Sequence, residues 1–268
     1  DFSYYSEKLR DQKFALNDEL LKPYFKLENV IDGAFKTATK LFGIRFKERN
    51  DIPKWHKDQQ VYEVLEEDGS HLGIIYMDFF IRDSKQGGAW MDDCRVRRVL
   101  HDGNIQLPVA YLTCNFSGPV GDVPALLTHD EVVTLFHEFG HGLHGLMTQI
   151  RYENFSGVDG PRDYTEFPAQ MLEHWAEQKQ VLAQYAKHHK TGAVIPDELV
   201  EKMLKASTFN QGFKTTEFIA ASLLDLAWHS LTPDEAAKIT DAAEFERETL
   251  ESYGLLSEIE PRYRSQYF

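Results

Sequence analysis

Apolar side chains recur every three or four residues along the first part of the chain, residues 1–50. This interval is typical of helices with one apolar face, because a helical turn takes about 3.6 residues. Pro23 and Gly43 interrupt the pattern, as residues at helix boundaries do. The sequence therefore predicts successive helices over residues 1–50.

The pattern changes over residues 58–117, where apolar residues alternate with polar ones or form short continuous runs. The runs QVYEVL and HLGIIYMDFF flank EEDGS, whose central pair Asp68-Gly69 favours a tight turn, so this part is predicted to be a β-hairpin. Two further short strands are predicted around GGAW and in LPVAYLTCNF. Together these strands would form one small antiparallel sheet.

Helical spacing returns at Thr128 and continues almost to the end of the chain. The loop SGVDGPRD at 156–163 interrupts it, and Pro196 and Pro233 stand near predicted helix starts. Helices are therefore expected over residues 128–190 and 196–268. There is no internal repeat, low-complexity tract or linker. The predicted fold class is mainly α with one small antiparallel β-sheet.

Composition narrows the possible partners. The 268 residues are 42% hydrophobic, which is enough for a substantial core, and 43 acidic residues against 29 basic ones give a net charge of −14. This charge disfavours nucleic acid and anionic membrane surfaces as partners. No apolar run approaches the roughly 20 residues that cross a bilayer, and DFSYYSEKLR lacks the pattern of a secretory signal. With only Cys94 and Cys114, reduced thiols and a cytoplasmic location are expected.

The run HEFGH carries the most specific chemistry in the sequence. Thr128 and Glu131 have the spacing of a capping box, which predicts that a helix begins just ahead of this run. On that helix His137 and His141 lie one turn apart on the same face, so both imidazoles can reach one ion, and Glu138 lies beside that face. Two histidines and one further carboxylate make a zinc site with its fourth position open to water. A chance match in a chain with 11 histidines is the simpler alternative.

A third ligand is needed, and two classes of candidate exist. One class of zinc peptidases would place Gly at position 144 and His at 147, but this chain has His144 and Met147, which excludes that class. His144 shares the face of His137, but seven helical residues separate them by roughly 10 Å, too far for one ion. We interpret His144 as a pocket or core histidine.

The other candidates are carboxylates in TEFPAQMLEHWAEQKQ, whose first helical turn Pro168 marks. Glu166 is a plausible ligand at the start of this helix. Glu173, two turns later on the same face, is either an acceptor for an imidazole N–H or part of a solvated acidic face. For Glu177 the solvated face is the preferred interpretation.

Three glycines, Gly140, Gly142 and Gly145, occur within the predicted helix. Each costs about 1 kcal/mol relative to Ala, so some other feature should offset the cost. A close approach of another backbone, room for a substrate, or a poorly formed helix end would each explain them.

The runs ALLTHDEVVTLFHEFGHGLHGLMTQ and SGVDGPRDYTEFPAQMLEHW together resemble the thimet oligopeptidase and oligopeptidase A family of zinc metallopeptidases. YYSEKLRDQKFALNDELLKPYF, KQGGAWMDDCR and LPVAYLTCNFSGP are most similar to its bacterial oligopeptidase A branch, so the resemblance covers nearly the whole chain. It implies a zincin-like, neurolysin-type helical fold with a deep channel between two halves. It also implies that His137, His141 and Glu166 bind zinc and that Glu138 is the general base.

The family pattern extends beyond this chain at both ends. In the family, an N-terminal helical region forms part of the channel, and a Gly- and Tyr-rich segment with a His lies beyond the position of Phe268. The chain begins at Asp rather than Met and ends in YRSQYF. Residues 1–268 are therefore expected to be a partial catalytic domain that lacks both segments.

The resulting hypothesis is a zinc-dependent peptidase that binds one Zn²⁺ per chain and hydrolyses internal bonds of short peptides. Gly87, Gly88, His144 and Arg162 are its candidate substrate-binding residues. A peptidyl-dipeptidase of the same family is the nearest alternative. A zinc-binding helical domain without hydrolysis and a helical scaffold with chance histidines are alternatives from other classes. The sequence does not indicate the oligomeric state.

Overall fold

The computed structural model describes residues 2–256, 258 and 261–268, with the side chain of Arg162 left out. The chain divides into two compact units, residues 1–204 and 205–268. Each unit is a separate body, and the predicted metal-binding residues all belong to the larger one.

The larger unit begins with the helices α1 (Phe2–Phe14), α2 (Asp18–Leu21) and α3 (Leu27–Phe42), with a short 3₁₀ turn, η1 (Lys22–Tyr24), before α3. Helix α3 ends at Gly43, whose φ of 77° is the left-handed conformation that favours glycine at a helix C-terminus. The predicted helical region 1–50 therefore stops at Phe42. Arg45–Glu48 form strand β1 instead, and Phe46 of this strand stacks on Phe35 of α3 with ring centroids 4.1 Å apart.

A five-stranded sheet in the order β1-β2-β3-β7-β4 follows. The predicted hairpin is present as β2 (Gln60–Leu65) and β3 (His71–Phe80), which are antiparallel. Strand β7 (Val109–Phe116) runs parallel to β3, so the sheet is mixed and not purely antiparallel as predicted. Strand β4 (Trp90–Arg95) pairs antiparallel with the other side of β7 and is the last strand in the order.

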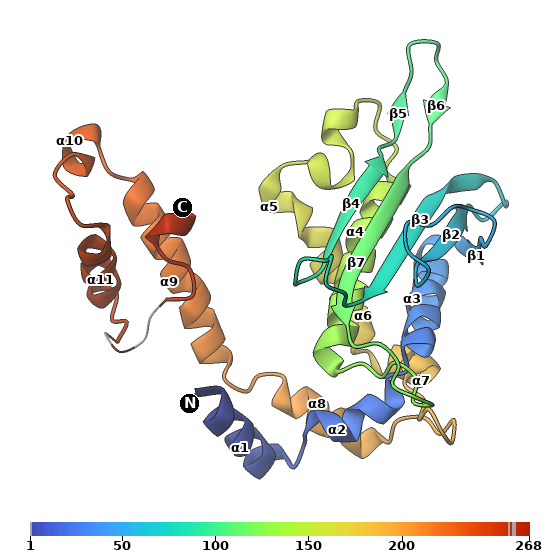
Figure 1. The fold of residues 1–268 in the computed structure, drawn as a ribbon, viewed down its shortest axis with the longest axis horizontal. Coiled ribbons are helices and arrows are strands. Elements are labelled where there is room, and N and C mark those ends of the chain that lie inside the picture. Colours follow the sequence, from blue (N-terminus) through green and yellow to red (C-terminus); the bar gives the residue numbers. More distant parts are fainter. Residues whose placement is uncertain (1, 257, 259–260) are drawn as a thin grey trace. The chain divides into compact units, whose positions relative to one another are not determined.

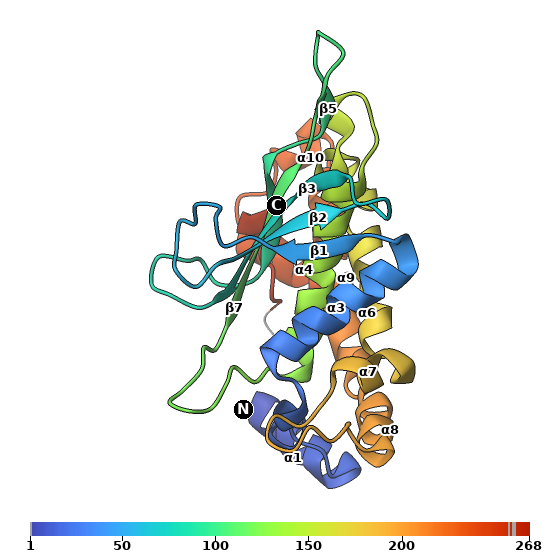
Figure 2. The same cartoon turned by 90° about the vertical axis from the view of Figure 1, so that its right-hand side faces the viewer.

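The parallel pair has a topological cause. After β4 the chain leaves the sheet for a small hairpin, β5 (Arg98–Val99) and β6 (Ile105–Gln106), and then returns as β7. The returning strand enters between β3 and β4, and Figure 1 shows these three strands side by side with the β5–β6 hairpin projecting beyond them. Helices α3, α4 and α6 lie on one side of the sheet in Figure 2. The mainly helical fold class is confirmed.

Helix α4 (His129–Met147) is the central element of the larger unit and packs against β7, β4 and β3. Thr128 caps it as predicted: its backbone N–H donates to the Glu131 carboxylate at 2.8 Å, and its Oγ1 accepts from the Glu131 N–H at 3.1 Å. The helix is continuous through all three glycines, so a poorly formed end does not explain them. Its buried apolar side chains are Val132, Leu135, Phe136, Phe139, Leu143 and Leu146.

Gly140 lies where α4 meets α6 (Phe167–Ala176). A Cβ atom at this position would lie 2.7 Å from the Cα of Ala169 and 3.1 Å from the backbone oxygen of Pro168. Backbone atoms cannot move aside as a flexible side chain can. The close approach of a second backbone, one of the explanations considered from the sequence, therefore accounts for Gly140.

Between α4 and α6 the chain forms the 3₁₀ turns η2 (Glu153–Phe155) and η3 (Gly157–Asp159) and the short helix α5 (Arg162–Thr165). Helices α7 (Lys179–Tyr185) and α8 (Asp197–Ala206) follow α6. Buried Tyr185 joins this part to the core, since its hydroxyl donates to the Ala176 carbonyl at 2.7 Å and its ring packs near that of Phe136.

Strand β4 contacts α4 at Gly145, where a Cβ atom would lie 2.8 Å from the Met91 Cε and 3.2 Å from the Asp93 Oδ1. Asp93 Oδ1 is buried and has no hydrogen-bond partner among the described residues. Burial, with smaller contributions from Asp92 and Asp159, raises the pKa of Asp93 to about 7. An ionised Asp93 is therefore unfavourable in the folded protein.

The smaller unit contains α9 (Gln211–His229), α10 (Pro233–Ala236), α11 (Ala242–Ser252) and a last 3₁₀ turn, η4 (Ser265–Tyr267). Its core joins Leu224 of α9 to Leu250 of α11, with the ring of Trp228 packed on that of Phe245 at 4.2 Å between centroids. The buried Glu246 carboxylate accepts hydrogen bonds from the Arg264 side chain and the Ser265 N–H. The helices predicted over 196–268 are present in the part of this region that the structure describes.

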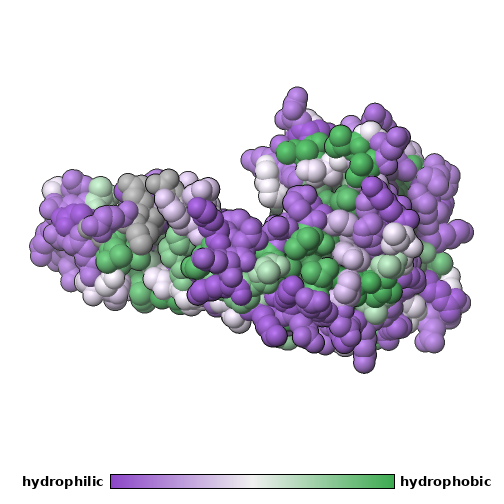
Figure 3. Space-filling model, turned by 90° about the horizontal axis from the view of Figure 1, so that it is seen from below, coloured by the Kyte–Doolittle hydropathy of each residue, from purple (hydrophilic) through white to green (hydrophobic). Residues whose placement is uncertain are grey.

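Apolar residues on the face seen in Figure 3 lie in separate patches among hydrophilic ones. Within the described residues, no helix combines the length and the hydropathy that crossing a membrane requires.

Replacing Gly140 by Ala should destabilise the larger unit by about 2 kcal/mol, because the new methyl group overlaps backbone atoms of α6. Urea unfolding followed by circular dichroism measures the change. Gly212→Ala in α9 is the matched control, since nothing lies within 4 Å of its Cβ position and Ala favours a helix. Equal stability for Gly140→Ala and the wild type would contradict the close contact.

Asp93 should contribute more to the stability of the folded protein at pH 5 than at pH 8. Because burial raises the pKa of Asp93 to about 7, the folded state takes up a proton in this range that the unfolded state does not bind. Asp93→Asn should raise the unfolding free energy at pH 8 by about 2 kcal/mol, allowing for partial solvent screening, and by less at pH 5. Thermal unfolding at both pH values tests this, with the exposed Asp122→Asn as control. An increase in the unfolding free energy of Asp93→Asn that is equal at both pH values would contradict this prediction.

Candidate metal centre

Helix α4 presents His137 and His141 on one face, as their spacing predicts. Their rings are nearly perpendicular, at 84°, with centroids 4.8 Å apart, and the two Nε2 atoms are separated by 3.2 Å. Two nitrogen atoms thus point toward one location. Glu138, on the neighbouring face of the helix, is 6% exposed.

The chain bends between α5 and α6, and Glu166 occupies the bend as the last residue before α6 begins. Pro168 lies in the first turn of α6, as predicted. Glu166 Oε2 is 3.1 Å from the Nε2 of His137 and 3.3 Å from the Nε2 of His141. The structure therefore brings together the three residues that the sequence proposes as metal ligands, although they come from two separate helices.

The spacing of these three atoms fits a divalent metal ion of the size of zinc. A tetrahedral ion with ligands at about 2.0–2.1 Å requires ligand atoms about 3.3 Å apart. The three observed separations, 3.1, 3.2 and 3.3 Å, are close to this value. Two imidazoles and a carboxylate are also the donor types that zinc accepts while one position stays open.

Glu173 fixes the orientation of His137. Its Oε1 lies 2.6 Å from the Nδ1 of His137 on the side of the ring away from the three converging atoms. This hydrogen bond, which is the main cause, raises the pKa of His137. A proton held at Nδ1 leaves Nε2 with its lone pair directed at the candidate site. Of the two interpretations left open for Glu173, the geometry supports the imidazole acceptor.

Burial shifts the pKa values of Glu138 and His141 in the direction that favours their neutral forms. Burial, together with the nearby Glu166, raises the pKa of Glu138 to about 7 against the opposing influence of His137. Burial and repulsion from His137 lower the pKa of His141. Glu138 Oε2 is buried and has no hydrogen-bond partner among the described residues, so the hydrogen-bonding capacity of this oxygen is unused.

The four candidate substrate-binding residues are placed differently from the metal group. His144 is half-buried outside this group, and its ring centroid is 6.1 Å from that of Tyr164. Gly87 and Gly88 lie in the loop before β4, where nothing lies within 4 Å of either Cβ position. Arg162 begins α5, and its side chain lies outside the described part of the structure.

Glu177, for which the sequence favours a solvated face, is half-buried and lies 3.6 Å from His129, so it links the end of α6 to the start of α4 and is less solvated than expected.

Two other residues were not singled out from the sequence. Lys85 and Asn115 hold the loop that contains Gly87 and Gly88. Asn115 lies within an apolar strand and Lys85 follows a polar turn, and neither position indicates a contact between distant segments.

Comparison with known proteins agrees with this geometry. Peptidase family M3 matches residues 1–268. The chain is 48% identical over 270 residues to a dipeptidyl carboxypeptidase of Escherichia coli, covering 100% of the chain and 39% of that protein. It is 42% identical over 243 residues to oligopeptidase A of Escherichia coli, covering 90% of the chain and 36% of that protein.

A thimet-like oligopeptidase of Dictyostelium discoideum is 36% identical over 251 residues, covering 91% of the chain and 36% of that protein. The chain thus spans a little over a third of the length of the curated relatives it matches. The metal-ligand geometry and the match over all of its residues lead to one conclusion: this chain belongs to peptidase family M3, a family of metal-dependent peptidases.

Proposed function

We propose that this chain carries the catalytic centre of a zinc peptidase that hydrolyses internal bonds of short peptides. The observation that carries the proposal is the convergence of one oxygen and two nitrogen atoms within 3.3 Å of one another, with the Glu138 carboxyl beside them. His137, His141 and Glu166 would hold one Zn²⁺ per chain, and Glu173 would orient His137.

Zinc, when bound, supplies a Lewis acid that polarises the peptide carbonyl and makes water more acidic. Glu138 then has the two proton transfers to perform. As its carboxylate it accepts a proton from the attacking water, whose oxygen bonds to the carbonyl carbon. In its protonated form, Glu138 gives that proton to the amide nitrogen when the C–N bond breaks. Burial raises the pKa of Glu138, which favours the return of the proton, whereas a nearby divalent cation would lower this pKa and favour the carboxylate that accepts the proton.

Substrate backbone would bind along strand β4. Within the described residues β4 is the last strand of the sheet and leaves one side of its backbone unpaired. An extended peptide can add to such an edge by main-chain hydrogen bonds. The open surroundings of Gly87 and Gly88 allow a peptide to approach the backbone just before β4. His144 and Arg162 are proposed as further substrate contacts from the sequence alone.

A second candidate, release of dipeptides from peptide C-termini, is favoured by one observation. The relative that matches the whole chain at 48% identity is named a dipeptidyl carboxypeptidase, whereas the match to oligopeptidase A is 42% identical over 90% of the chain. Product lengths distinguish the two activities. A peptide blocked at its C-terminus should be cut by the first activity and resist the second, so mass spectrometry of the products decides between them.

Glu138→Gln should abolish peptide hydrolysis, with a fall of at least about 10³-fold in kcat, while zinc content stays at one per protein. The measurement combines metal analysis with cleavage of an internally quenched, end-blocked peptide, using both this chain and the full-length protein. Glu201→Gln on α8 is the matched control and should retain activity and metal.

Each result has a definite meaning. A folded chain that binds no zinc after reconstitution would refute the ligand assignment. Zinc binding without hydrolysis of either blocked or free peptides by the full-length protein would instead establish a zinc-binding domain that lacks peptidase activity.

Glu173→Ala should lower the affinity for zinc about tenfold or more, because His137 loses the acceptor that fixes its tautomer and ring orientation. Competition with a chromogenic chelator measures the affinity. Glu177→Ala, on the same helix but away from the three ligand atoms, should bind zinc as the wild type does. Equal affinities for Glu173→Ala and Glu177→Ala would remove Glu173 from the metal centre.

A further inference from the structure

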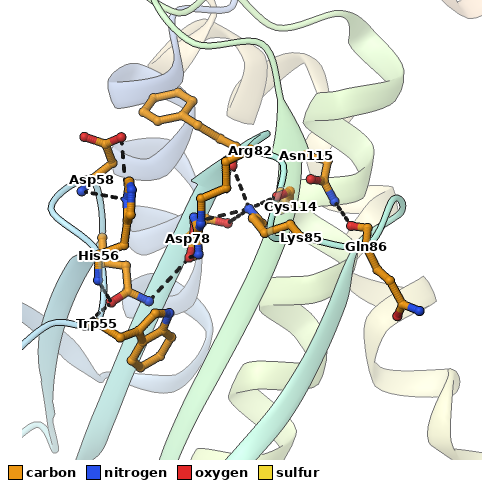
Figure 4. A network of polar contacts seen from close by, with 11 residues as sticks. Trp55, His56, Asp58, Asp78, Arg82, Lys85, Gln86, Cys114 and Asn115 are labelled. Atoms are coloured by element: carbon orange, nitrogen blue, oxygen red, sulfur yellow. Dashed lines mark hydrogen bonds and ion pairs between the residues drawn. The ribbon is translucent and has the colours of Figure 1, made fainter.

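A buried ammonium group lies beneath the loop that leads into β4. The Lys85 side chain is 4% exposed, and its Nζ donates hydrogen bonds to the backbone carbonyls of Phe80 at 2.8 Å and of Cys114. It also lies 3.2 Å from the Asp78 carboxylate. Lys85 therefore joins its own loop to the ends of β3 and β7 (Figure 4).

Asp78 is the centre of this polar cluster. Its carboxylate is 3% exposed, and both of its oxygens accept from the Arg82 guanidinium, at 2.7 and 2.6 Å. Burial alone would raise the pKa of Asp78, but the hydrogen bonds from Arg82 and Lys85 outweigh it and lower the pKa. A buried carboxylate paired with two cations is strongly destabilised when one partner is removed, so the cluster fixes both ends of the segment 82–85.

Asn115 holds the next part of the same loop. Its Nδ2 donates to the carbonyl of Gln86 at 2.6 Å and to the carbonyl of Gly88 at 2.7 Å. Gly88 has a φ of 94°, a conformation that favours glycine. Trp90 of β4 pairs with Thr113 of β7, so Asn115 lies two residues further along β7 and continues the link between the two strands with its side chain.

Lys85 contacts β7, Asn115 belongs to it, and α4, the helix that carries Glu138, packs against the same strand. Cys114, whose carbonyl accepts from Lys85, is buried, and burial raises the pKa of its thiol with a further contribution from Glu138. Nothing lies within 4 Å of the Cβ position of Gly87 or Gly88, so no apolar packing surrounds these positions. The order of this loop must come from the polar side chains beneath it.

We infer that Asn115 and Lys85 are positioning residues for substrate: they hold the 85–89 segment so that its backbone receives an extended peptide at the level of Glu138. The inference rests on the proposed peptidase function and adds the residues that set the position of the substrate relative to Glu138. Neither residue touches the metal ligands. Their effect should therefore appear in peptide affinity and not in zinc affinity.

Asn115→Asp tests the inference, because aspartate has the shape of asparagine but cannot donate to the two carbonyls when ionised. The variant is made in a Glu138→Gln background loaded with zinc, so that an uncleaved peptide can be titrated. Asn104→Asp in the exposed turn between β5 and β6 is the matched control, since it adds the same charge in a different loop. The readouts are hydrogen exchange of residues 86–89, zinc content and the Kd of an extended hexapeptide.

The expected result is faster exchange of residues 86–89 and a rise of about tenfold in the peptide Kd, with zinc content unchanged, for Asn115→Asp but not for Asn104→Asp. Lys85→Arg should retain most of the affinity and Lys85→Met should lose it. Unchanged exchange would overturn the holding role, and faster exchange with unchanged affinity would overturn the positioning role. A zinc-loaded parent that binds no peptide, although exchange responds to Asn115→Asp, would overturn the proposed function and with it this inference.

Discussion

The contact between α4 and α6 is the constraint on which the candidate site depends. Gly140 lies between the two histidines of α4, and Ala169 lies between Glu166 and Glu173 of α6. A side chain at Gly140 would push against backbone atoms of α6 and move the helices apart. Separations of 3.1 and 3.3 Å between the histidines and Glu166 allow little such movement. Gly140 is thus part of the metal centre although it binds nothing, and this offsets its cost in a helix.

The local part of this arrangement could be predicted and the distant part could not. His137 and His141 share a face because of the helical repeat alone, and the capping box fixes where their helix begins. Helical spacing also places Glu173 two turns beyond Glu166, but it does not identify the helix against which the face carrying both residues packs. The sequence left the role of Glu173 open, since only the packing of α6 on α4 decides whether its carboxylate faces water or an imidazole. The choice of Glu166 as the third ligand came from the family resemblance.

The sheet shows the same limit. Its hairpin is fixed by Asp68-Gly69 and was predicted, because the turn lies within a few residues of both strands. The entry of β7 between β3 and β4 depends on partners distant in the chain, and alternation of apolar residues is compatible with either strand direction. Lys85 was missed for a related reason. A lysine in KQGG is typical of a solvated turn, and its burial follows only from the carbonyls that the ends of β3 and β7 direct toward it.

The candidate metal centre and the proposed peptide-binding loop are held in place by different interactions. Metal ligands must be placed to within tenths of an ångström, and close packing of α4 on α6, together with the hydrogen bond between Glu173 and His137, provides this. The proposed peptide-binding side must expose backbone, and the Cβ positions of the glycines in its loop have no neighbour within 4 Å. A segment without packing stays mobile unless hydrogen bonds hold it. Burying Lys85 and Asp78 is costly, and the cost is understandable if the order of the exposed loop depends on them. A chain that only had to fold could cover this end of the sheet with apolar residues instead.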